Sequence, residues 1–154
     1  MVANLYETYL VPPSAYLLRH YPTLLPDWPT PPQQLLFIFF QAQLSLALAG
    51  DAVEQEKERL WQAFQHWGQQ IYRDLASSSL PVEIICPRSG QPQYSQVGSQ
   101  VFDLPALVSA CLGWELRGQG DCKAVLHPEW QEACYPGLVV IGQQGLAGQN
   151  SPYP

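Results

Sequence analysis

The chain has 154 residues, of which 47% are hydrophobic and 13% charged, and it carries a formal net charge of −6. This composition is typical of one soluble folded domain that is long enough to bury a substantial core. Because its seven Lys and Arg residues are scattered through an acidic chain, we expect no basic stripe that neutralises several phosphates and therefore no nucleic-acid binding.

Neither a membrane span nor a secretory signal is predicted. The most hydrophobic stretch, residues 35–49, is shorter than a membrane-spanning helix and is interrupted by Gln41, Gln43 and Ser45. Residues 1–10 contain Glu7 and lack a cationic region followed by an apolar one. We therefore expect a cytoplasmic protein whose cysteines stay reduced.

In chain order, the first predicted element is a short helix capped by Ser14. Its inner side is expected to carry Leu17, Leu18 and Tyr21. An ordered loop follows, because prolines remove backbone donors at Pro22, Pro26, Pro29, Pro31 and Pro32. Over residues 35–49 the even positions are all apolar, and the polar residues Gln41, Gln43 and Ser45 all fall at odd positions. This period predicts a long strand with one buried face.

The clearest helix signal lies between Asp51 and Ser77. Asp51 and Glu54 resemble a capping box at its start. An apolar stripe at helical spacing follows, formed by Val53, Leu60, Phe64, Trp67, Ile71 and Leu75. We expect this helix to cover one face of a sheet.

The second half of the chain predicts shorter elements. A strand over residues 82–86 ends in the turn Pro87-Arg88-Ser89-Gly90. A second helix is predicted with Asp103 as its cap, Pro105 in its first turn and Gly113 at its end. Further short strands are expected at residues 114–117, 122–126 and 138–141.

These elements together predict a single α+β domain over residues 1–142. Its sheet is expected to be mainly antiparallel, with the long helix on one face. The Gln- and Gly-rich residues 143–154 are expected to form a flexible C-terminal tail.

Catalytic motifs are not found in the sequence. His20, His66 and His127 lie in different predicted elements, and no nucleophile, zinc-protease or nucleotide-binding motif occurs. The cysteines show no C-x-x-C pair; they are Cys86, Cys111, Cys122 and Cys134. We therefore expect that the chain alone builds neither a metal site nor a catalytic centre.

The densest group of chemically active side chains lies between Gly118 and Trp130. Lys123 follows Cys122 directly in the sequence, and its cation would favour the thiolate form of that cysteine. The thiolate is the form that attacks electrophiles and binds metals. A structural role is the alternative, with His127 bonding the backbone near Pro128 and Trp130 filling the core.

The same segment resembles a known family. Residues 120–127 read Gly-Asp-Cys-Lys-Ala-Val-Leu-His and are followed by Trp130. This run resembles the G-C-C-K-V-x-x-H-x-x-W stretch of the methylmalonic aciduria and homocystinuria type D family, which takes part in cobalamin trafficking. The helix from Val53 and the turn at residues 87–90 resemble further segments of that family in the same order. The likeness spans about residues 12–141, in a short form without the family's amino-terminal extension.

The resemblance implies a fold similar to flavin nitroreductases, without an evident flavin site. It also implies a cysteine thiolate that contacts cobalt, namely the first of the family's adjacent pair. Here that position is Asp121, and the second position is Cys122. The implied cofactor-binding residues are therefore Asp121, Cys122, His127 and Trp130.

Two classes of function remain open. The resemblance favours a noncatalytic adaptor or carrier in intracellular cobalamin trafficking, which shares cobalamin with a cobalamin-processing or cobalamin-dependent protein and holds no cofactor tightly. The alternative is an assembly or scaffold protein that keeps the fold without binding a corrinoid. A flavin- or thiol-dependent reductase is a third, less favoured class. A homodimer is compatible with each of them.

Overall fold

A four-stranded antiparallel sheet is the largest element of the computed structural model, which describes residues 5–118 and 123–143. Its strand order is β1-β2-β6-β3. The strands are β1 (Tyr6–Val11), β2 (Pro32–Gln41), β3 (Val82–Ile85) and β6 (Cys134–Gly142). The prediction of an α+β fold with an antiparallel sheet is confirmed.

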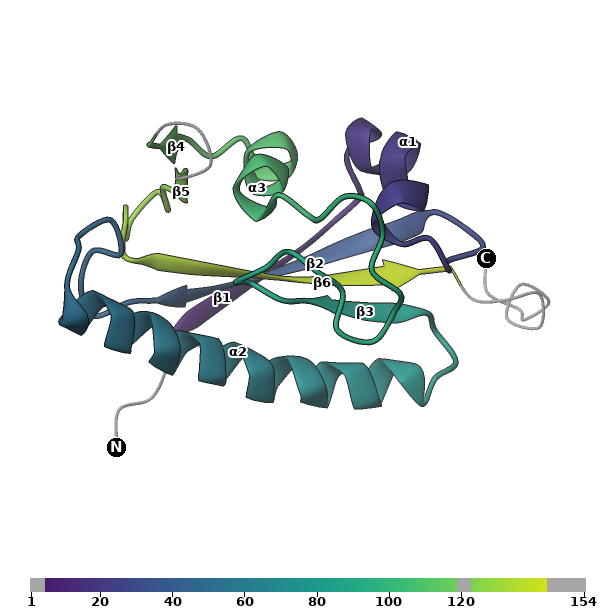
Figure 1. Ribbon diagram of the computed structural model, residues 1–154, viewed down its shortest axis with the longest axis horizontal. Helices are drawn as coiled ribbons and strands as arrows, with labels where there is room; N and C mark the ends of the chain where they lie inside the picture. The colour runs from purple at the N-terminus through teal and green to yellow at the C-terminus, as the bar shows by residue number, and fades with distance from the viewer. Residues whose placement is uncertain (1–4, 119–122, 144–154) are drawn as a thin grey trace.

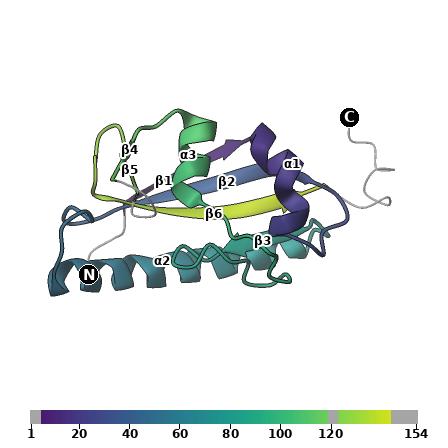
Figure 2. The same ribbon diagram turned by 45° about the horizontal axis from the view of Figure 1, so that its top comes forward.

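The described part of the chain also contains helices on both sides of this sheet. They are α1 (Ala15–Leu24), α2 (Asp51–Ala76) and α3 (Leu104–Leu112). Figure 1 shows α2 along one side of the sheet and α1 and α3 on the other, and Figure 2 shows the same arrangement in a turned view. A small ribbon pairs β4 (Leu116–Arg117) with β5 (Ala124–Val125). None of the described helices is both long and apolar enough to cross a membrane.

The core has two layers because β2 and β6 are buried on both faces. On the side of α2, Phe64 belongs to a buried cluster with Ile38 of β2 and Val139 of β6. On the opposite side, Leu107 of α3 belongs to a cluster with Phe37 of β2. Apolar burial on both faces of the same two strands therefore connects all three helices.

Two residues allow β6 to occupy a central position in the sheet, between β2 and β3. Gly137 lies beneath the ring of Phe64, where any Cβ would overlap that ring. Pro136 pairs with Phe39 in a non-hydrogen-bonded pair, so the N–H that it lacks would point away from β2. The pairing of β6 with β3 begins only at Leu138, and no ladder bond is lost at the proline.

Several local predictions are confirmed. The Ser14 hydroxyl accepts a hydrogen bond from the Leu17 N–H at 3.2 Å and caps α1. The Asp103 carboxylate accepts the Ala106 N–H at 3.1 Å and caps α3. Gly113 ends α3 in the left-handed conformation, with φ of 74°. Short-range cap chemistry thus fixes these helix boundaries.

The strand predicted over residues 35–49 is wrong in extent, because β2 ends at Gln41. Beyond it, the Glu56 carboxylate accepts the Gln43 N–H at 2.7 Å, and the Leu46 N–H donates to the Glu132 carbonyl at 3.1 Å. The first bond ties the chain to α2, and the second ties it to the residues that precede β6. The strand is also buried on both faces rather than one, which explains why its alternation was misleading.

Three predictions about helix positions are also wrong. Pro22 lies inside α1 rather than in the following loop. Leu18 is 45% exposed instead of lying on the inner side of that helix. Gly50, not Asp51, precedes α2 as its cap, and no side chain caps this end.

The later strands differ from their predicted bounds as well. The strand expected over residues 138–141 is β6, which begins earlier, at Cys134. The strand expected over residues 122–126 is reduced to Ala124–Val125, and Cys122 lies outside the described residues. The sequence reasoning missed β1 altogether. Residues 144–154 of the expected tail also lie outside the described part.

Replacing Phe64 by Ala should destabilise the protein by about 3 to 5 kcal/mol, because it removes a fully buried ring that α2 packs over β6. Thermal and urea unfolding measure the loss. Tyr16→Ala is the matched control, since that ring is 52% exposed. An unchanged melting temperature for Phe64→Ala would contradict the assignment of this core layer.

Candidate functional site

The segment that carries the family resemblance joins β4 to the loop before β6. Asp121 and Cys122 lie outside the described residues. Lys123, His127 and Trp130 are described, and they differ in burial. Lys123 is exposed, Trp130 is partly buried and His127 is only 2% exposed.

Both ring nitrogens of His127 are bonded within the fold. Nδ1 accepts the N–H groups of Glu129 and Trp130 at 2.9 and 3.0 Å. Nε2 lies 2.8 Å from a carboxylate oxygen of Glu7 on β1. Because Nδ1 accepts, the ring proton belongs on Nε2 and is donated to Glu7. His127 therefore joins the first strand to the end of the candidate segment.

Aromatic rings enclose this histidine. The Trp130 ring stacks on it with centroids 3.9 Å apart and an interplanar angle of 7°. Trp114 meets it edge-on at 5.0 Å. A ligand could reach neither ring nitrogen without breaking these bonds. His127 and Trp130 are thus brought together as a structural pair that fixes the segment from its C-terminal side.

Glu7 is the residue in this arrangement that the sequence reasoning missed. The hydrogen bond from His127 lowers the pKa of the Glu7 carboxyl, outweighing its partial burial, and a bond from the Tyr9 hydroxyl at 3.0 Å adds to the effect. Burial, with the bond to Glu7, raises the pKa of Tyr9. The β-forming residues of Tyr6–Val11 were an available signal for the strand, but nothing local pairs Glu7 with a histidine 120 residues away.

A polar hollow of about 380 Å³ lies beside the same segment. Its walls are the turn at residues 87–90, the start of α3 at residues 101–105, and Lys123. The last of these residues directly follows the part of the chain that holds Asp121 and Cys122. Lys123 therefore borders a solvent-accessible hollow, whereas the C-terminal side of the segment is fixed at His127.

The turn beside this hollow begins with Cys86. Partial burial acts to raise the pKa of its thiol, but hydrogen bonds from Ser89 and from the Arg88 backbone outweigh burial and lower it. The Arg88 guanidinium pairs with Glu58 and lies 4.1 Å above the Trp61 ring. Cys86 is therefore the most readily ionised thiol among the described cysteines.

The two other described cysteines behave as packing residues. Burial raises the pKa of Cys111, and it raises the pKa of Cys134 to about 12. Among residues 5–118 and 123–143, no three His, Cys, Asp or Glu side chains gather closely enough to hold a metal ion.

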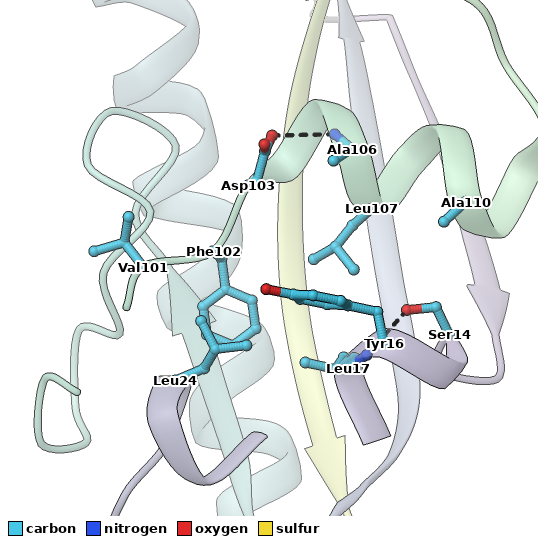
Figure 3. A pocket seen from close by; sticks show the side chains of 10 residues that line it. All are labelled: Ser14, Tyr16, Leu17, Leu24, Val101, Phe102, Asp103, Ala106, Leu107 and Ala110. Carbon is cyan, nitrogen blue, oxygen red and sulfur yellow. Dashed lines mark hydrogen bonds between the residues drawn. The ribbon is translucent and has the colours of Figure 1, made fainter. Parts of the chain in front are cut away.

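An apolar pocket of about 370 Å³ between α1 and α3 was not anticipated. Figure 3 shows Leu17, Leu24, Phe102 and Leu107 around it, with the Tyr16 ring reaching across. The polar groups at its rim, Ser14 and Asp103, are already used as helix caps. This pocket runs along both helices and shares with the polar hollow the wall formed by residues 101–103.

Comparison with known proteins adds no assignment: no protein-family model matches the chain, and no curated protein matches it in sequence.

Replacing Glu7 by Gln should make stability less sensitive to acid. The pKa of Glu7 is lower in the folded protein than its ordinary value of 4.5. The ionised carboxylate therefore stabilises the fold fully at pH values above 4.5, and this contribution disappears as the pH falls through the folded-state pKa. The wild type should therefore lose more stability than Glu7→Gln between about pH 5 and pH 3. Because solvent screens this partly exposed carboxylate, the cost of Glu7→Gln near neutrality should be below about 1 kcal/mol.

Melting temperatures measured across this pH range test the expectation. Glu115→Gln is the control, because that side chain is exposed. Parallel acid profiles for wild type and Glu7→Gln would show that the bond between Glu7 and His127 contributes nothing to stability.

Proposed function

We propose that this protein is a noncatalytic adaptor in intracellular cobalamin trafficking, which acts through contact with a cobalamin-processing or cobalamin-dependent protein. The observation that supports this most is the contrast within one segment. Its C-terminal side is held by His127, while Lys123 lies at the rim of an open polar hollow. A contact surface needs such a combination of a fixed base and an accessible side.

In this proposal, Cys122 is the residue that touches a corrinoid presented by the partner. A thiolate is a soft ligand and suits a corrin cobalt better than the hard carboxylate of Asp121. His127 and Trp130 act as positioning residues, since their rings are stacked and the histidine nitrogens are occupied. The corrinoid is cargo shared with the partner, not a tightly held cofactor.

The finer fold assignment is part of the same proposal. We propose a nitroreductase-like arrangement with the long helix on one face and no flavin site. The supporting observation is that α2 contributes Leu60 and Phe64 to the cluster formed with β2, β3 and β6. A cytoplasmic location belongs to the proposal as well, since cobalamin routing between enzymes takes place inside the cell.

A scaffold protein that binds no corrinoid is the second candidate. It is favoured by the complete use of His127 within the fold, and by the replacement of the family's first cysteine by Asp121. Such a protein would use the same surface for protein contacts alone.

An absorbance titration separates the two candidates. The purified chain is mixed with a processing protein loaded with hydroxocobalamin, and the visible spectrum of the corrinoid is recorded. The adaptor proposal expects a cobalt-linked spectral shift with the wild type. Cys122→Ser should abolish it, because this change removes the soft ligand with little change in volume. Cys111→Ser is the control, as that thiol lies in α3.

The other outcomes identify what is wrong. A shift that survives Cys122→Ser but vanishes in Asp121→Ala would mean that the carboxylate has taken the cobalt-contacting position. No shift in the wild type would overturn the adaptor proposal in favour of the scaffold. A yellow purified protein would instead indicate bound flavin.

A further inference from the structure

The two edges of the sheet differ in how they are protected. At β3, the Gln93 N–H donates to the Ile84 carbonyl at 3.0 Å, and the Cys86 N–H donates to the Gln91 carbonyl at 2.9 Å. The fully buried Glu83 carboxylate also accepts the N–H of Gln93 at 2.8 Å. The chain thereby covers its own edge at β3 with residues 91–94.

The edge at β1 has no such cover within the described residues. The Gln41 N–H donates to the Leu5 carbonyl at 2.9 Å, which marks a hydrogen-bonded pair. Hydrogen-bonded and non-hydrogen-bonded pairs alternate along antiparallel strands. The N–H and C=O groups of Tyr6, Thr8 and Leu10 therefore point away from β2, and no residue in 5–118 or 123–143 pairs with them.

The side chains of the same three residues are also uncovered. Tyr6 is 48% and Leu10 is 56% exposed. They lie on the α2 side of the sheet, but the buried cluster beneath α2 extends only as far as β2. The opposite face of β1 is covered, because Tyr9 and Val11 pack against the other cluster.

Features that usually prevent edge pairing are missing from β1. Its sequence Tyr-Glu-Thr-Tyr-Leu-Val contains no Pro or Lys, and its pairing with β2 shows no bulge. Its one charged residue, Glu7, is already bonded to His127 and Tyr9. As far as residues 5–118 and 123–143 are concerned, the edge is therefore open to a further strand, and β1 carries no unpaired charge that would repel one.

We infer that β1 is the docking edge for a second copy of this chain, which pairs antiparallel with it so that the two sheets become continuous. A two-fold axis at Thr8 places each outward-pointing backbone group opposite a group that can bond it. Tyr6 then lies opposite Leu10 of the partner subunit, and Thr8 opposite Thr8 of the partner subunit.

The charges of the edge also select a second copy. With the axis at Thr8, Glu7 lies opposite Tyr9 of the partner subunit, so that like charges do not face each other although the chain carries a net charge of −6. The apolar side chains of Tyr6 and Leu10 then face each other across the two copies, and the Glu7 carboxylate faces the Tyr9 phenol. A different protein would have to supply the same pattern by coincidence, whereas a second copy supplies it by symmetry.

The inference predicts a dimer in sedimentation equilibrium of the full chain at about 100 µM that dissociates on dilution. Thr8→Pro should weaken the dimer about tenfold or more, because it removes an outward N–H and leaves the bonds to β2 intact. Leu10→Lys is a second variant that places a charge on the edge. Leu18→Lys is the matched control, because Leu18 is a comparably exposed apolar residue on α1.

Circular dichroism and the melting temperature check that each variant is folded. A wild type that is monomeric at this concentration would overturn the inference. It would also be overturned if the edge of β1 bound a different protein and the chain itself stayed monomeric. A dimer that survives both Thr8→Pro and Leu10→Lys would overturn it as well. Because no corrinoid is present in this experiment, its outcome is independent of the adaptor proposal.

Discussion

The antiparallel pairing of β2 with β6 is the interaction on which the rest of the structure depends. It joins residues 32–41 to residues 134–142, and both strands are apolar on both faces. One face receives α2 through Phe64, and the other receives α1 and α3 through Leu17 and Leu107. Because β6 is the last strand of the described residues, neither core layer is complete until residues 134–142 have paired.

The candidate site inherits its position from this pairing. β6 follows directly after the loop that contains His127, and Glu7 lies on β1, which pairs with the other side of β2. The bond between the two residues thus closes a link across the central strands. It holds the C-terminal end of the segment at residues 118–130, while Lys123 borders the polar hollow. The strand that carries Glu7, β1, is also the one that forms the open edge of the sheet.

Short-range signals in the sequence predicted the boundaries that depend on neighbouring residues. Ser14, Asp103 and Gly113 act where expected, because a cap needs only the adjacent backbone. The limits of β2 and β6 depended on contacts between distant segments, such as the capture of the Gln43 N–H by Glu56. The role of Glu7 was equally inaccessible, since its partner is remote in the chain. The resembling segment was found from its residues, and the alternative that His127 bonds the backbone near Pro128 agrees with the two N–H groups that its Nδ1 accepts. No local pattern indicates its other bond, to Glu7.

Hydrogen exchange of backbone amides at single-residue resolution tests the central role of the β2 and β6 pairing most directly. The amides that bond these two strands should exchange slowest, through global unfolding only, and those of α2 should open at an equal or lower free energy. Amides of α2 that stay protected after those of β2 and β6 have exchanged would contradict this account, because the helix would then be stable without the strands it packs against.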